Sequence, residues 1–533
     1  MNRQFLLLLA LLLLSVAPFA AQGQDESVLN YAIRQSPDTI NVNLTTASGV
    51  VNMMSHVYDT LVVQHPLGTY HPGLANSWDI NEDATEYTFH MRDDATFHDG
   101  TPVNAHAVKF MIEHIQDPEN NAQGALSVLG PLEEVEVVDD YTVTFRFSSP
   151  YAIFLNSVSL PFLGLNSPTA VAEIGEDYGL TTVVGSGAYM VESYVIDDSL
   201  VLAKNPNWTW GPEEVFGTSG PASFDKIVYT FVLDQTSRVA ALEAGQADFA
   251  DGLSTADVDR LSAAENLSII AIEQPGHGYS LMFNAERYPS NQLSVRQAIA
   301  SAIDRQAVVD IVFNGYAKPA CSPFTRAMPF FDDVQCQVYP LEPDPDKARA
   351  ILEADGWIDT DGDGIREKDG EPLRLEHWTI VGGLRFPDVS VVIEPFIDDI
   401  GIDFNLNIAS RAGYFDAVRA GEHHTQHWWD TSIEPDTVSR TLFHSSNADG
   451  GTNRNRYRNQ EMDDLIEAAS STPISEERAA IYSQIQQKIT DEVVMFFIAD
   501  PNYIYGSTKN LQGVTFLAGG NVVNFTVAYF GDE

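Results

Sequence analysis

Three clusters of side chains in this 533-residue chain could do chemistry, and the first is an acidic loop. Asp359, Asp361 and Asp363 alternate with a threonine and two glycines. This is the first half of a calcium loop, in which oxygens at positions one, three and five surround a hard cation. The twelfth position should carry a bidentate glutamate but is Gly370. The loop is therefore a weak calcium candidate, and a plain turn is the favoured alternative.

The second cluster consists of three histidines, His423, His424 and His427. On a helix, His423 and His427 would share a face and suit zinc or nickel, although His424 stands where a zinc protease needs a glutamate base. On a strand, the same two side chains would lie about 13 Å apart, too far to share one ion. The residues alone leave both possibilities open.

The third cluster, Trp428-Trp429-Asp430, follows at once. Adjacent tryptophans are costly to expose, and on a strand their side chains point to opposite faces. We therefore expect one indole to pack in the core and the other to line a cavity. The neighbouring carboxylate would give that cavity one polar handle.

Motifs of known hydrolases are missing from the sequence. It contains no G-x-S-x-G or H-E-x-x-H pattern, and its acids are too numerous for one catalytic pair to stand out. We therefore predict that the protein is not an enzyme and holds no cofactor; a secreted hydrolase is the alternative from a different class.

The composition is that of a folded and strongly acidic protein. Hydrophobic residues make up 44% of the chain and charged residues 20%, which is typical of globular domains. The length suits two or three domains. With 75 acidic and 29 basic residues, the net charge is −46. A polyanion repels phosphate backbones, so nucleic acid is excluded as a partner.

The amino terminus reads as an export signal. Arg3 precedes an apolar run over residues 5–14, which is too short for a comfortable membrane span. We expect residues 1–23 to be a signal peptide and the mature protein to be periplasmic or on the outer face of the cell membrane. In an exported chain, Cys321 and Cys336 should pair, which would stabilise the fold by roughly 3 kcal/mol. Two buried free thiols are the alternative.

Local patterns predict several elements. Tyr87, Phe89 and Met91 alternate with polar residues, as in a half-buried strand. Asn104 can cap a helix that has its apolar residues on one face. Gly185 lies in a G-x-G segment without a phosphate-loop spacing, so we interpret it as a point of close backbone approach. A hairpin is expected over 135–147, and helices over 50–62, 295–305 and 344–355.

The wording of several segments resembles a known family. Residues 97–102 read FHDGTP and precede a helix with Ala-Val-Lys-Phe at 107–110. This resembles the signature of family 5 extracytoplasmic solute-binding proteins, the peptide, nickel and oligosaccharide receptors of ABC importers. LANSWDI at 74–80, NPNW at 205–208 and VRQAI at 295–299 continue the resemblance in order. It spans essentially the whole mature chain.

The resemblance implies an α/β fold with two lobes around a ligand cleft. The fold would be of the type II periplasmic-binding-protein kind, with an extra domain inserted in the first lobe. The implied core domain of lobe I consists of residues 24–57, 186–274 and 500–533. The extra domain of lobe I covers 58–185, and lobe II covers 275–499.

The resemblance also implies a function and a site. The protein would capture short peptides, or as an alternative oligosaccharides or another small solute, and deliver them to ABC permease subunits, acting as a monomer. In peptide-binding members, the segment at Trp428–Asp430 is a strand that pairs with the ligand backbone and presents an aspartate to its amino terminus. Here Thr431 stands at the expected aspartate position, and Asp430 comes one residue early. The full expected ligand site comprises Trp428, Trp429, Asp430 and Thr431, the facing edge Thr46, Ala47 and Ser48, and His277.

Overall fold

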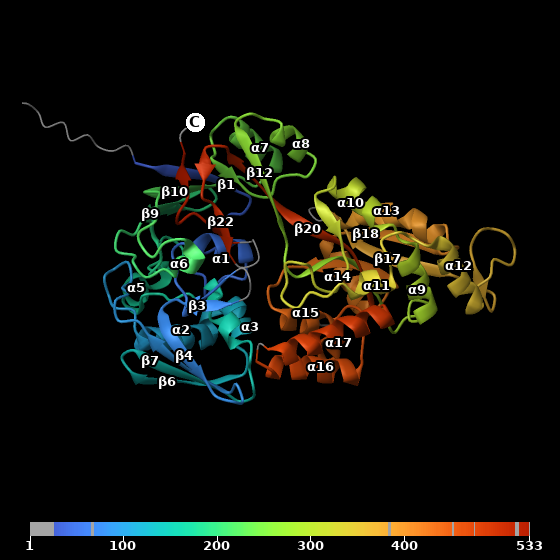
Figure 1. Ribbon diagram of the computed structural model, residues 1–533, viewed down its shortest axis with the longest axis horizontal. Helices are drawn as coiled ribbons and strands as arrows, with labels where there is room; N and C mark the ends of the chain where they lie inside the picture. The colour runs from blue at the N-terminus through green and yellow to red at the C-terminus, as the bar shows by residue number, and fades with distance from the viewer. Residues whose placement is uncertain are drawn as a thin grey trace, which may run out of the picture.

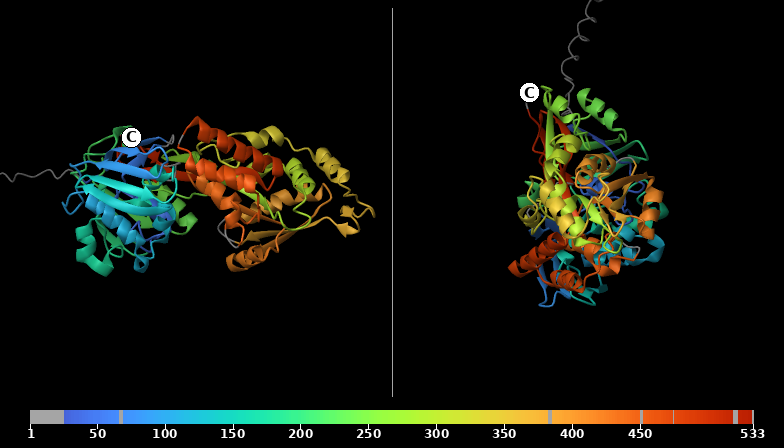
Figure 2. Two further views of the ribbon diagram at one scale, coloured as in Figure 1. Left: turned by 90° about the horizontal axis from the view of Figure 1, so that it is seen from below. Right: turned by 90° about the vertical axis from the view of Figure 1, so that its right-hand side faces the viewer.

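The protein consists of two lobes that lie side by side along its longest axis (Figures 1 and 2). The computed structural model describes residues 26–65, 69–381, 385–449, 452–473, 475–517 and 522–531. The expected signal peptide, residues 1–23, lies outside them. Within the described ranges, no helix is both long enough and apolar enough to cross a membrane.

One lobe is built on a mixed sheet formed by the first and last parts of the chain. At its centre, β1 (Val28–Ile33) runs parallel to β10 (Lys226–Phe231) on one side and to β11 (Phe249–Ala250) on the other. The other elements of this lobe's core are α1 (Ser48–Met54), β8 (Tyr189–Val195), β9 (Ser199–Lys204), α6 (Glu213–Phe216), α7 (Gln235–Glu243), α8 (Val258–Ser262), β12 (Leu267–Glu273), β21 (Leu511–Gln512), β22 (Thr515–Leu517), β23 (Val522–Asn524) and β24 (Tyr529–Phe530).

A four-stranded antiparallel sheet lies below this core in Figure 1, in the order β4-β5-β7-β6. In β5 (Glu86–Met91) every second side chain is buried, as the alternation in sequence predicts. The side chain of Asn104 accepts a hydrogen bond from the Ala107 N–H and caps α2 (Ala105–Gln116), so the predicted cap is confirmed. The predicted hairpin is present as β6 and β7. The remaining elements here are β2 (Val62–Gln64), β3 (Tyr70–Pro72), β4 (Ala75–Ile80), α3 (Gln123–Leu129), β6 (Leu132–Asp139), β7 (Thr142–Phe147), α4 (Phe154–Ser157) and α5 (Pro168–Ile174).

The other lobe is built on a second mixed sheet. Its central strand β19 (Thr425–Asp430) lies between β13 (His277–Phe283) and β17 (Arg374–Ile380). The other elements are α9 (Leu293–Ala302), α10 (Arg305–Phe313), β14 (Ala317–Pro319), α11 (Val334–Val338), α12 (Pro345–Ala354), β15 (Glu367–Lys368), β16 (Glu371–Pro372), α13 (Phe386–Asp398), β18 (Asp403–Ala409), α14 (Arg411–Ala420), α15 (Pro435–Phe443), α16 (Gln460–Ser471) and α17 (Glu476–Glu492). The predicted disulfide joins Cys321 to Cys336 in this lobe.

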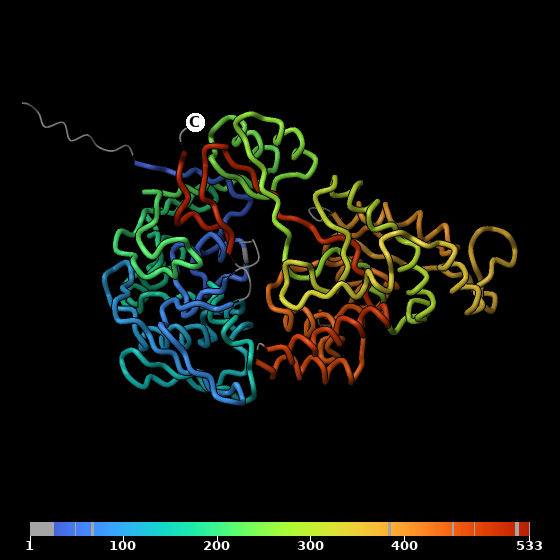
Figure 3. Tube along the Cα trace, in the orientation of Figure 1, coloured from blue at the N-terminus to red at the C-terminus, as the bar shows by residue number. Residues whose placement is uncertain are grey.

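Two segments connect the lobes, and both are extended (Figure 3). One is the short link 274–276 between β12 and β13. The other is β20 (Met495–Thr508), a single strand of 14 residues. Its first half pairs with β13 and β14, and its second half pairs with β12 and β11. β20 is therefore shared by the sheets of both lobes.

Two predicted helices differ from the structure. The helix expected over 50–62 ends at Met54 as α1, and the chain then turns. The Asp59 carboxylate accepts hydrogen bonds from the Trp210 indole at 2.8 Å and the Ser186 hydroxyl at 3.0 Å, which holds this segment out of the helix. The helix expected over 295–305 is two helices, because Asp304 accepts from the Ala307 N–H and begins α10.

The structure agrees with the interpretation of Gly185 as a point of close backbone approach. A Cβ at Gly185 would lie 2.1 Å from the Val57 carbonyl oxygen, so only glycine allows these two segments to approach. Gly187 donates its backbone N–H to the same carbonyl at 2.9 Å. These contacts join the segment that leaves the core of the first lobe to the segment that returns to it.

Candidate functional site

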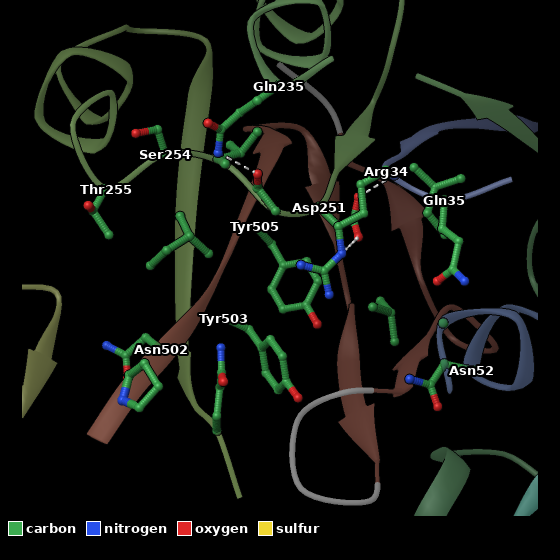
Figure 4. Close-up of a pocket in the computed structure, with 18 of the residues that line it drawn as sticks. Arg34, Gln35, Asn52, Gln235, Asp251, Ser254, Thr255, Asn502, Tyr503 and Tyr505 are labelled. Atoms are coloured by element: carbon green, nitrogen blue, oxygen red, sulfur yellow. Dashed lines mark hydrogen bonds and ion pairs between the residues drawn. The ribbon is translucent and has the colours of Figure 1, made fainter. Parts of the chain in front are cut away.

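The candidate site is a cavity of about 280 Å³ to which both lobes contribute. Figure 4 shows its labelled side chains, which come from the residues after β1, from α1, from the start of α7, from the residues after β11, and from β20. The residues that line it include Tyr31, Arg34, Asn52, Asp251, Tyr503 and Tyr505 from the first lobe, and Tyr279, Phe313, Arg385 and Trp429 from the second.

An ion pair forms one wall of the cavity. Arg34 directly follows β1 and Asp251 directly follows β11, so the parallel pairing of these strands brings both residues to one sheet edge. The Arg34 backbone N–H donates to Asp251 Oδ1 at 2.8 Å, and its Nε lies 3.2 Å from Oδ2 (Figure 4). Burial raises the pKa of Asp251, and the guanidinium of Arg34 opposes that rise. The pair therefore provides a polar wall with little net charge.

The rest of the wall is largely aromatic and amide-bearing. Tyr503 and Tyr505 are two residues apart on β20, and both line the cavity. From the second lobe, the Trp429 ring meets the Tyr279 ring edge-on with centroids 6.0 Å apart. Arg385 adds a cationic side chain at the start of α13. Such a mixture suits a small polar solute with apolar parts.

The structure separates the two adjacent tryptophans. Trp429 lines the cavity. Trp428 lies instead against Arg454, whose guanidinium carbon is 3.8 Å from the ring centroid. This division follows from the alternation of side chains along β19.

The other expected site residues lie near the cavity but do not line it. Asp430 is exposed, and its carboxylate accepts the Thr431 N–H at 2.8 Å. His277 is buried opposite Asp430 on β13, and neither ring nitrogen has a hydrogen-bond partner among the described residues. Burial lowers the pKa of His277 to about 3, so the imidazole is neutral.

On the facing side, Thr46 is exposed, Ala47 precedes α1 and Ser48 begins it. The next residues of this helix, Gly49 and Asn52, line the cavity. The expected edge thus directly precedes the residues that α1 contributes.

The strand β19 has an open edge beside the cavity. On the β17 side, its ladder stops after two residue pairs, the second being Trp378 with Gln426. Beyond that point no strand of the described residues pairs with His427–Asp430 on this side. An unpaired strand edge can accept another backbone as an added strand.

Sequence reasoning missed the first-lobe half of the cavity. Arg34, Asp251, Tyr503 and Tyr505 were not singled out, although residues that follow parallel strands are a recognised signal for ligand sites in α/β proteins. The signal could not be used without knowing that β1 and β11 are neighbours.

Neither metal candidate is part of this cavity. In the acidic loop, Glu367 joins Asp359, Asp361 and Asp363, and one ligand oxygen from each lies within 4.8 Å of the others. Several of these oxygens already accept backbone N–H groups of the same loop. The three histidines His423, His424 and His427 are buried and bonded to the main chain, His424 through both ring nitrogens and the other two through one each. Burial lowers their pKa values to about 4.

The architecture and the inter-lobe cavity define the class of two-lobed solute-binding proteins. Residues 69–450 match the model of "Bacterial extracellular solute-binding proteins, family 5 Middle", so the chain belongs to this family. Its members bind peptides or small solutes and work with ABC transporter permeases.

Two curated relatives and a solved structure are similar over almost the whole chain. The nickel-binding periplasmic protein of Escherichia coli K12 is 26% identical over 515 residues, 95% of each chain. The dipeptide-binding protein of the same organism is 25% identical over 527 residues, 93% of this chain and 94% of its own. The periplasmic binding protein DppA from Helicobacter pylori, solved with the peptide STSA, has a TM-score of 0.73 at 23% identity, over 95% of this chain and 99% of its own.

Proposed function

We propose that this protein is the exported, monomeric receptor of an ABC importer and that it captures short peptides in the inter-lobe cavity. It would bind the solute and hand it to the permease without altering it chemically. The expected domain division, with lobe II over 275–499, is part of the same proposal.

The open edge of β19 is the observation that carries the peptide assignment. A peptide could add to the edge at His427–Asp430, and main-chain hydrogen bonds would then provide affinity without reading side chains. Trp429 would cover the ligand from the second lobe, and Arg385 could contact a terminal carboxylate. The relative named for dipeptides agrees with this assignment. The relative named for nickel is equally similar, so identity alone does not choose the ligand.

Closure would take place about the two connections between the lobes. Gly276, beside β13, has φ of 112°, and a Cβ there would lie 2.2 Å from the Asp430 carbonyl oxygen. The link 274–276 and the middle of β20 are the only described segments in which the strands change from one sheet to the other. Bending at these few residues would bring Trp429 toward Arg34 and Tyr503 and bury the solute.

The test is direct titration of the purified protein. Calorimetry with a mixture of di- to tetrapeptides should give one site per chain, and native mass spectrometry should identify the bound peptides. Disaccharides and nickel–histidine, titrated in parallel, should give no heat. Binding of a sugar or a metal complex in place of peptides would overturn the ligand assignment, and turnover of any bound peptide would overturn the receptor role.

A further inference from the structure

The second lobe holds another cavity, of about 370 Å³, that lies on the Trp428 side of β19. Arg419, Arg454 and Arg456 line it together with Phe415, and the described lining includes no aspartate or glutamate. Arg419 pairs with Asp416 and Arg456 with Glu286, outside the lining, so Arg454 is the arginine of this cavity with no carboxylate partner among the described residues. A cavity with an unpaired cation attracts anions.

The sequence at 453–456, Asn-Arg-Asn-Arg, builds this wall by alternation. Asn453 and Asn455 are buried, and their amide groups donate to backbone carbonyls at 2.8 and 3.1 Å. His423 also bonds through Nε2 to the Arg454 carbonyl oxygen at 2.9 Å. The two asparagines and the histidine fix the main chain, and the side chains of Arg454 and Arg456 line the cavity.

Arg454 is the central cation. Its guanidinium lies 3.8 Å from the Trp428 ring centroid and 5.2 Å from that of Phe415. Its side chain has no hydrogen bond and no ion pair with any other described residue. A guanidinium carries five N–H donors in a planar fork, and leaving them without acceptors in a half-buried place is costly. Cation–π contact holds the group in position but satisfies none of these donors.

Arg456 lines the same cavity as Arg454, and its backbone conformation is uncommon. Its φ is 51°, in the left-handed region that residues with a side chain seldom adopt. Its guanidinium lies over Gly421, where a Cβ would be 3.1 Å from the guanidinium carbon. Its Nη2 donates to the Arg419 carbonyl oxygen at 2.6 Å. Strained backbone of this kind persists where the surrounding structure enforces it, and such residues concentrate at ligand sites.

We propose that this cavity is a second binding site, for a small oxyanion such as a carboxylate or phosphate group. Arg454 makes the direct contact, because two parallel N–H donors match the two oxygens of such a group. Arg419 and Arg456 add N–H donors at the rim, where each also pairs with a carboxylate, Asp416 and Glu286 respectively. The oxyanion is either a free ion or an acidic group of the transported solute, and the two share the same chemistry.

Calorimetric titration with inorganic phosphate and with succinate, in 0.1 M sodium chloride at pH 7, tests the site. The unaltered protein should bind at least one of them, and Arg454→Gln should weaken that binding at least tenfold. The matched control is Arg458→Gln. It removes the same charge nearby, from a side chain that pairs with Glu286 and Asp449 and does not line the cavity. The affinity of the Arg458→Gln variant for the anion should stay within twofold of that of the unaltered protein.

Two results would overturn the proposal: no binding of either anion by the unaltered protein, or an equal loss in Arg458→Gln. If the Arg454 variant fails to fold because it loses its packing on Trp428, Arg419→Gln, at a side chain that is 59% exposed, decides. A several-fold loss in that variant supports the site, and unchanged affinity rejects it.

The source of the oxyanion is separated by competition with the dipeptides Ala-Glu and Ala-Ala. Displacement of phosphate by Ala-Glu but not by Ala-Ala assigns the site to an acidic group of the solute. Unchanged phosphate binding with both peptides assigns it to a free anion. Only this competition experiment rests on the proposed peptide function. If neither peptide binds the protein, the proposed anion site is unaffected.

Discussion

Arg478 donates to Glu434 at 2.7 Å, and both side chains are almost completely buried. Glu434 is the N-cap of α15, three residues after Thr431, and Arg478 comes from the first turn of α17. Burial alone would lower the pKa of Arg478, but the Glu434 carboxylate raises it above its ordinary value. The pair therefore fixes the chain just beyond the open edge of β19.

Breaking this pair should destabilise the protein strongly. Arg478→Met leaves the Glu434 carboxylate buried without its partner, which should cost about 3–5 kcal/mol in the free energy of unfolding. Urea denaturation measures the change. Arg374→Met removes an exposed arginine that pairs with Asp403, and it should have little effect. Equal losses in both variants would show that the buried pair has no special role.

Stability should fall as the pH is lowered from about 6.5 toward 4. Burial depresses the pKa of several histidines in the folded protein to about 3–4, whereas in the unfolded chain it is about 6.5. The unfolded state therefore binds more protons in this window, and stability rises with pH. The residues concerned are His56, His98, His277, His423, His424 and His427.

Buried carboxyl groups oppose this trend, because burial raises their pKa values in the folded protein; Asp59, Asp251 and Glu434 are among them, and Asp500 shows the effect most clearly. Burial raises the pKa of Asp500 to about 8, so this group binds a proton on folding and favours the folded state at low pH. Between pH 7 and 5 the unfolded state gains protons on six histidines, and we expect this gain to exceed the protons that the carboxyl groups bind in the folded state. Urea denaturation between pH 7 and 5 should show the net loss, and His427→Asn should reduce the slope. A free energy of unfolding that stays flat or rises on acidification would contradict the assignment of these histidines as neutral and buried.

The two tryptophans should differ in their effect on binding. Trp429 lines the inter-lobe cavity, so Trp429→Ala should weaken the binding of the peptide identified by mass spectrometry by about 2–4 kcal/mol. Trp428→Ala is the matched control at the neighbouring position and should change peptide affinity much less. If the Trp428 variant loses more affinity than the Trp429 variant, the ligand lies on the other side of β19.

Asp430→Asn distinguishes the ligand classes. If the carboxylate pairs with a peptide amine when the lobes close, the variant should lose roughly 2 kcal/mol or more of binding free energy. A smaller loss, measured by the same calorimetry, would favour a hydroxyl-bearing ligand such as a sugar.

Millimolar calcium should leave the melting temperature unchanged. Gly370 stands at the twelfth loop position, and both Asp359 carboxylate oxygens already accept backbone N–H groups, at 2.7 and 3.2 Å. A clear rise with calcium that Asp361→Ala abolishes would show that Glu367 makes up for the missing ligand.

Structural features that depend on residues close together in the sequence could be predicted. The Asn104 cap and the alternation in β5 were read correctly because each involves residues a few positions apart. The helix over 50–62 was predicted too long because Asp59 is held by Trp210, 151 residues away. The Arg34–Asp251 ion pair was missed for the same reason. The two residues are 217 positions apart, and their proximity can be predicted only when the strand order is known. The sequence likewise predicted that one of Trp428 and Trp429 lines a cavity, but it could identify neither which one nor its partners in the first lobe.

The shared strand β20 also bears on how the protein melts. Its residues belong to the buried cores of both lobes: Phe496 and Ile498 on one side, Tyr503 and Tyr505 on the other. Neither sheet can lose this strand without exposing apolar surface of the other. Two lobes joined by a loose linker would absorb heat in two separate steps. Because the two lobes of this protein share strand β20, calorimetry should show a single cooperative unfolding transition.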